Sequence, residues 1–86
     1  MKFSDPRLFL YRDDAMRVAR HYHLNPEQLV VETFVPRNNA IFVETVDGNA
    51  FRIHINLQEN RIISAKQLNG NSVDKAIFQK YLDYMK

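Results

Sequence analysis

The sequence predicts an α+β domain in which one helix precedes a four-stranded antiparallel β-meander and a second helix follows it (α-β-β-β-β-α). Three observations predict this class. Apolar residues recur with helical spacing near both ends of the chain. Four β-rich runs lie between these segments, and the short turn-rich links that join them favour antiparallel neighbours. We treat residues 1–86 as a single domain, because the chain falls within the usual size of one.

The first helix is expected from about Asp13 to His23. Acidic residues at its start suit a helix N-terminus, and apolar residues then follow at i, i+3, i+4 and i+7. These are Ala15, Val18, Ala19 and Tyr22. The helix should end before Pro26, which restricts the residue that precedes it. Upstream, Asp5-Pro6 could start another helix, but residues 7–11 could equally be extended, and we leave them undecided.

Four runs are expected to form the sheet. They are Leu29 to Val35, Ala40 to Val46, Ala50 to Leu57 and Arg61 to Leu68. The third run alternates most clearly, with apolar residues at every second position from Phe51 to Leu57. Such alternation indicates one buried and one open face.

The loop after the second run decides the register of the central hairpin. A two-residue Asp47-Gly48 loop would place Glu44 opposite Phe51. A three-residue loop that includes Asn49 in the left-handed conformation would pair Thr45 with Phe51 and keep the apolar residues of both strands together. We predict the three-residue loop.

The same logic extends to the neighbouring strands. A three-residue loop with Asn60 left-handed sets Ile55 opposite Ile63 and Ile53 opposite Ala65. The first link should span five residues, from Pro36 to Ala40. The core face of the first strand would then carry Leu29, Val31, Thr33 and Val35.

These registers place aromatic and charged side chains on the open face of the sheet. The candidate binding residues are Phe34, Phe42, His54, Glu32, Glu44 and Arg52. An exposed phenylalanine pair beside a charged row is unusual for a free surface. Either the N-terminal segment or the C-terminal helix covers this face, or it binds another protein or a second copy of the chain.

The C-terminal helix should begin at Ser72, an N-cap residue, with Asp74 in its first turn. Its apolar residues occupy more of its circumference than one sheet contact needs. Those on its outer side, Phe78, Leu82 and Met85, form a candidate interface with a second subunit.

A helix followed by a four-stranded meander over Asp13 to Leu68 resembles PepSY and cystatin-type small domains in topology. The matching segments are the apolar positions of the helix, Phe51 to Ile55, and Arg61 to Ala65. The export signal typical of PepSY proteins and the glycine usual in their last turn are missing from this sequence.

The composition narrows the function classes. Hydrophobic residues make up 45% of the chain, so a packed core is expected. The net charge of +2 comes from interspersed residues and does not by itself imply nucleic acid. Absence of cysteine excludes thiol chemistry and fits a reducing compartment. Because we find neither a signal peptide nor a membrane span, we expect a cytoplasmic protein without a membrane partner.

No catalytic, metal or cofactor motif is found. An enzyme hypothesis would pair Glu32 with Glu44 near His54, but nothing marks a nucleophile. His21 and His23 lie two residues apart, and on a helix their side chains diverge, so this spacing does not favour a metal site. We therefore predict a non-enzymatic protein-interaction module that forms a homodimer. The alternative is a nucleic-acid-binding module that stacks bases on the sheet-face aromatics, with an arginine-rich margin. That margin would consist of Arg7, Arg12, Arg17, Arg20 and Arg37.

Overall fold

The structure is a computed structural model that describes residues 1–70 and 75–85. Its elements, in chain order, are η1 (Pro6–Tyr11), α1 (Arg12–His21), η2 (Pro26–Gln28), β1 (Leu29–Val35), β2 (Asn39–Val46), β3 (Asn49–Asn56), β4 (Arg61–Gln67) and α2 (Lys75–Leu82). The strands form one antiparallel sheet in the order β1-β2-β3-β4. The predicted α+β class is confirmed. The expected N-cap Ser72 and first-turn Asp74 lie outside the described residues.

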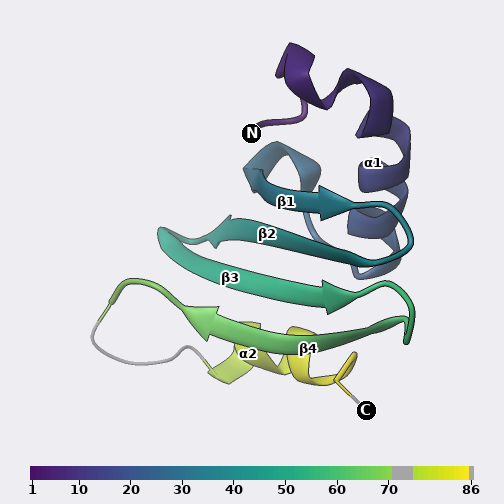
Figure 1. Cartoon of the computed structure of the whole chain (residues 1–86). Coiled ribbons are helices and arrows are strands. Elements are labelled where there is room, and N and C mark those ends of the chain that lie inside the picture. The colour runs from purple at the N-terminus through teal and green to yellow at the C-terminus, as the bar shows by residue number, and fades with distance from the viewer. Residues whose placement is uncertain (71–74, 86) are drawn as a thin grey trace.

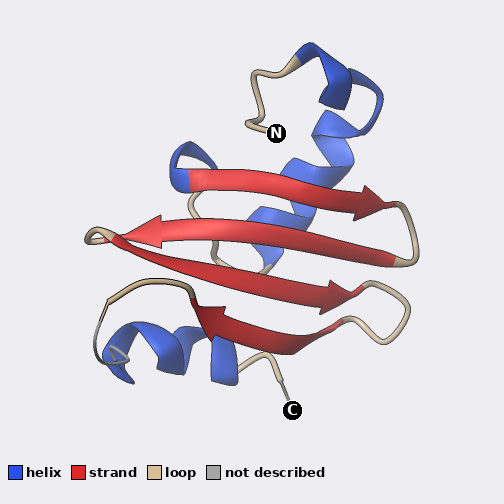
Figure 2. Cartoon of the chain, turned by 60° about the vertical axis from the view of Figure 1, so that its left-hand side comes forward, coloured by secondary structure: helices blue, strands red, loops and turns tan. Residues whose placement is uncertain are grey.

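The fold has two layers. Both helices lie on one face of the sheet, α1 behind β1 and β2 and α2 behind β4, and the other face is open (Figures 1 and 2). The N-terminal segment extends beyond the edge of the sheet at β1 (Figure 1). The backbone of Met1 pairs there with Val31 in both directions, so part of the β1 edge is covered. Because both helices lie on the same side of the sheet, no helix in the described part of the chain covers the open face.

The segment before α1 is a 3₁₀ helix, which settles the question left open by the sequence. The side chain of Asp5 accepts a hydrogen bond from the backbone N–H of Arg7 at 2.8 Å, and Pro6 follows as the first helical residue. The Arg7 guanidinium also donates to this carboxylate and thereby lowers the pKa of Asp5 to about 2. Only Leu8 of this element is buried.

Helix α1 ends earlier than Pro26 would require. His23 adopts a left-handed conformation with φ of 59°. Its N–H donates to the carbonyl of Arg20, and the N–H of Leu24 donates to the carbonyl of Ala19. This is the Schellman arrangement, which satisfies the last carbonyls of a helix. Leu24 is buried, so the helix end is anchored to the core.

The central hairpin has the two-residue turn, and the predicted three-residue loop is wrong. Val46 pairs with Asn49, while Asp47 and Gly48 take φ values of 51° and 81°. A type I′ turn requires positive φ at both central residues, and Asp-Gly supplies it at little cost. The side chain of Asn69 supports the turn by donating to the carbonyl of Gly48 and accepting from the N–H of Ala50. Glu44 consequently lies opposite Phe51.

The hairpin between β1 and β2 also differs from the prediction. Val35 pairs with Asn39, so the link contains three residues instead of five. A bulge interrupts the register at Glu32, and a bulge reverses the alternation of the residues that follow it. Leu29 and Val31 face the core as predicted. Beyond the bulge Phe34 faces the core, and the expectation that Thr33 and Val35 would do so is wrong.

The hairpin between β3 and β4 follows the prediction in part. Asn56 pairs with Arg61, so its loop contains four residues, 57–60, and the predicted three-residue loop is wrong. Asn60 is left-handed, with φ of 56°, and Ile53 pairs with Ala65 as expected. A bulge places Ile62, not Ile63, opposite Ile55. Ile62 is fully buried, whereas Ile63 is 39% exposed.

The core lies between the sheet and the helices. Its largest fully buried side chains include Phe42, Phe51, Ile53, Ile55, Ile62, Tyr22 and Tyr81. Helix α1 contributes two alanines, Ala15 and Ala19, whose small size permits close approach to the strands. Helix α2 contributes Tyr81, whose ring lies 5.4 Å from that of Phe51. Burial of each such large side chain stabilises the fold by about 1.5–3 kcal/mol.

Candidate functional site

The structure separates the residues that the sequence had placed on one sheet face. Phe42 and Glu44 are fully buried on the core face, so their assignment to an open binding surface is wrong. The two-residue turn is the physical reason, because a one-residue change of register moves a whole strand to the other face. Phe34 is partly buried and packs against the core.

Three of the candidate residues remain on the open side. Arg52 and Glu32 are exposed there, and Arg52 Nε lies 3.0 Å from Glu32 Oε1. His54 is half-buried on the next outward position of β3, opposite Ile41 and Ser64. Glu32 and Glu44 therefore belong to opposite faces, and the expected pairing of these two carboxylates is wrong.

The open face is divided into an aliphatic half and a cationic half. One row across the sheet consists of Val30, Val43, Arg52 and Lys66, and the next consists of Thr33, Ile41, His54 and Ser64. The aliphatic side chains belong to β1 and β2, and the cationic ones to β3 and β4. Val30 is 38% exposed and Val35 is 46% exposed. None of the described strand residues in these rows is a phenylalanine or tyrosine, and His54 carries their one ring.

The carboxylate of Glu44 is enclosed by hydrogen-bond donors. Tyr81 donates its hydroxyl to Glu44 Oε1 at 2.6 Å, and Lys80 Nζ lies 3.0 Å from the same oxygen. The backbone N–H of Asn25 donates to Oε2 at 2.6 Å. Burial and the bond to Glu44 raise the pKa of Tyr81 far above its usual value. These contacts join β2 to α2 and to the start of η2.

The aromatic and imidazole rings near the C-terminus form a second cluster. The ring of Tyr84 packs edge-on against that of Tyr22, with centroids 5.1 Å apart, and its hydroxyl contacts His23 Nδ1. The ring of His21 packs against that of Tyr22. Burial raises the pKa of Tyr22, and the nearby Tyr84 adds to the effect. The histidines thus connect the end of α1 to the residues after α2, and in the described part of the chain no three His, Asp or Glu side chains gather as a metal site.

The candidate interface on α2 is mostly turned toward this chain's own core. Phe78 and Met85 are partly buried and pack against the core. The ring of Phe78 lies edge-on to that of Tyr81, with centroids 6.2 Å apart. Leu82 is 39% exposed. A contact between α2 and a second subunit stays a prediction, and Leu82 is its best-placed residue.

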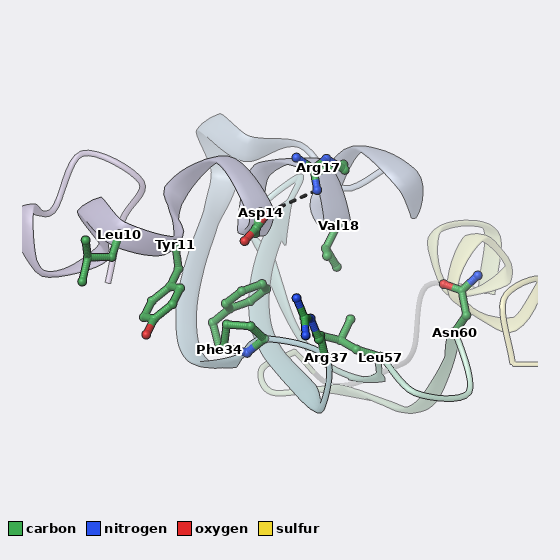
Figure 3. Close-up of a pocket in the computed structure, with 10 residues that line it drawn as sticks. Leu10, Tyr11, Asp14, Arg17, Val18, Phe34, Arg37, Leu57 and Asn60 are labelled. Carbon is green, nitrogen blue, oxygen red and sulfur yellow. Dashed lines mark hydrogen bonds and ion pairs between the residues drawn. The ribbon is translucent and has the colours of Figure 1, made fainter.

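Sequence reasoning missed a groove between the N-terminal helices and two loops of the sheet (Figure 3). It has a volume of ≈ 680 Å³. Its lining residues are Leu10, Tyr11, Asp14, Arg17, Val18, Phe34, Pro36, Arg37, Leu57 and Asn60. Of the candidate binding residues, Phe34 alone belongs to it. The signal that could have revealed it is the apolar run at residues 8–11, because a short 3₁₀ helix cannot bury four consecutive apolar side chains.

Comparison of the chain with protein-family models, with curated proteins and with solved structures finds no match. The helices within residues 1–70 and 75–85 are too short or too polar for a transmembrane span.

Proposed function

We propose that this chain is a non-enzymatic protein-interaction module that self-associates through the open face of its sheet. The observation that carries the proposal is the aliphatic half of that face. Val30, Val35, Ile41 and Val43 lie over β1 and β2, opposite the helices. A continuous apolar patch rimmed by polar residues is typical of an interaction site.

The distribution of charge favours a symmetric arrangement. A two-fold axis along the β1–β2 half would stack the aliphatic halves of two copies and keep their cationic halves, with Arg52 and Lys66, at opposite ends. The pair of Glu32 and Arg52 lies at the boundary between the halves. Such an exposed pair contributes only about 0–1 kcal/mol, so it would orient the copies more than hold them together. The lack of cysteine fits a cytoplasmic location.

The nucleic-acid alternative is less well supported. Its stacking platform required exposed aromatic rings, but Phe42 is fully buried and Phe34 faces the core side. The cationic half of the sheet, with Arg52 and Lys66, still favours it, and Arg17 lies near Arg37 in one hollow and near Arg20 in another. Binding to heparin that weakens steeply with salt would support this alternative, and absence of retention at low salt would argue against it.

Light scattering over a concentration series tests the self-association. We expect a mass that rises to that of a dimer, and a monomer for Val30→Lys, which places a charge in the aliphatic half. Ser64→Lys is the matched control, because it adds the same charge to the cationic half of the same face. A wild-type protein that stays monomeric at every concentration, or a Ser64→Lys variant that dissociates as readily as Val30→Lys, would contradict the proposal.

A further inference from the structure

The groove beside the N-terminal helices is a second candidate surface, distinct from the open sheet face, and its wall contains both apolar and charged side chains. It continues onto side chains that the fold leaves in solvent: Leu10 is 80% exposed, Phe9 70% and Tyr11 42%. The ring of Tyr11 lies 6.3 Å from that of Phe34, which joins these side chains to the groove wall. Exposed large apolar residues that adjoin a concavity indicate a binding groove.

The groove carries one uncompensated positive charge. Asp14 on α1 is neutralised by Arg17, whose Nη1 lies 3.1 Å from the carboxylate. Among the described residues Arg37 has no hydrogen-bond or ion-pair partner. Figure 3 places Arg37 between Phe34 and Leu57, below Asp14 and Arg17 of α1. Arg37 thus lines the groove together with the apolar Phe34, Pro36 and Leu57, and its guanidinium offers an incoming carboxylate a planar pair of donors.

We propose that this groove binds a segment of a partner protein in which apolar side chains flank an aspartate or glutamate. Arg37 would hold the carboxylate, and Phe34, Leu57 and Leu10 would contact the apolar side chains. The complementarity of charge selects an acidic segment. The open groove favours a peptide, since a free lipid chain would need a more enclosed cavity. This site does not depend on the proposed self-association.

Selection of random peptides displayed on phage against the immobilised full chain tests the proposal. We expect the enriched peptides to combine apolar residues with Asp or Glu. A labelled enriched peptide should bind Arg37→Glu at least about tenfold more weakly than wild type, because a charge-assisted pair is replaced by repulsion. Arg20→Glu makes the same charge change on α1, at an exposed residue outside the groove lining, and should leave the affinity unchanged.

The proposal would be overturned if no peptide is enriched, if the enriched peptides lack acidic residues, or if Arg20→Glu loses as much affinity as Arg37→Glu. A loss of self-association in Arg37→Glu would also overturn it, because the groove would then be occupied by a second copy of the chain. Val30→Lys separates the two surfaces. It should keep full peptide affinity whether or not the open sheet face mediates self-association.

Discussion

The hydroxyl of Tyr81 on α2 donates a 2.6 Å hydrogen bond to the carboxylate of Glu44 on β2, a residue with no exposed surface. A buried carboxylate is tolerated only when its oxygens are satisfied. Here Lys80 and the backbone N–H of Asn25 supply the other donors. This contact connects the C-terminal helix to the sheet, and it explains how the register imposed by the Asp47-Gly48 turn remains stable.

Removal of the hydroxyl in Tyr81→Phe should lower the free energy of unfolding by about 1–3 kcal/mol, the usual cost of leaving a buried polar group short of a partner. The ring and its contact with Phe51 would remain. Urea denaturation followed by circular dichroism measures the change. Glu44→Leu should lower the free energy of unfolding by more than Tyr81→Phe, because it leaves the Tyr81 hydroxyl, Lys80 and the Asn25 N–H without their acceptor. Wild-type stability in Tyr81→Phe would mean that the bond contributes nothing.

Stability should fall at alkaline pH, and Tyr81 should account for part of that fall. Its folded pKa lies above the ordinary value of 10.0, mainly because the phenol is buried. The folded state then holds the proton more tightly than the unfolded state, so this contribution is complete below pH 10.0 and is lost as the pH rises above it. Thermal unfolding at increasing pH should show a smaller alkaline loss in Tyr81→Phe than in wild type. Equal losses would contradict this role.

Gly48→Ala should destabilise the protein by about 1–2 kcal/mol, because φ at this position is 81° and the left-handed region is costly for residues with a Cβ. Apart from the adjacent residues, no atom of the described residues lies within 4 Å of the added methyl group, so steric contact adds little to this cost. Asp47→Asn is the matched control, since asparagine also tolerates the left-handed region. A melting temperature unchanged by Gly48→Ala would show that the turn can adopt another type.

Arg37→Gly should raise the free energy of unfolding by up to about 1 kcal/mol, because Arg37 adopts φ of 64° and glycine does so without strain. The side chain has no described partner whose loss would offset this gain. The same variant should lose affinity for the enriched acidic peptides. A gain in stability with a loss of binding would indicate a residue retained for function, whereas a clear loss of stability would reveal a structural role.

Residues Leu8 and Leu10 should respond differently to substitution by serine. Leu8 is 1% exposed and Leu10 is 80% exposed. Leu8→Ser should cost at least about 2 kcal/mol by analogy with other large-to-small core changes. Leu10→Ser should change stability by no more than about 0.5 kcal/mol but should weaken peptide binding. Chemical denaturation and binding of the labelled peptide distinguish these effects, and a similar stability loss in both variants would be inconsistent with the burial of η1.

Features that depend on residues close together in the chain were predicted correctly from the sequence, and features that depend on contacts between strands were not. The helical spacing of Ala15, Ala19 and Tyr22 placed α1 correctly, and the left-handed Asn60 was expected from its loop. The bulges at Glu32 and near Ile63 were not foreseen. A bulge leaves no local signature in a run of β-forming residues, because it depends on how neighbouring strands pack.

The sequence by itself determined the order and type of the four strands and of helices α1 and α2, since hydrophobic periodicity and turn residues act over a few positions. Only the tertiary structure decided which face carries Glu44. A glutamate is usually exposed, and the apolar pattern alone favoured the register that kept it so. Its burial depends on donors 19, 36 and 37 residues away along the chain, and no local pattern encodes contacts between groups so distant in sequence. The groove could not be predicted from the sequence for the same reason, because its walls come from segments that only folding brings together.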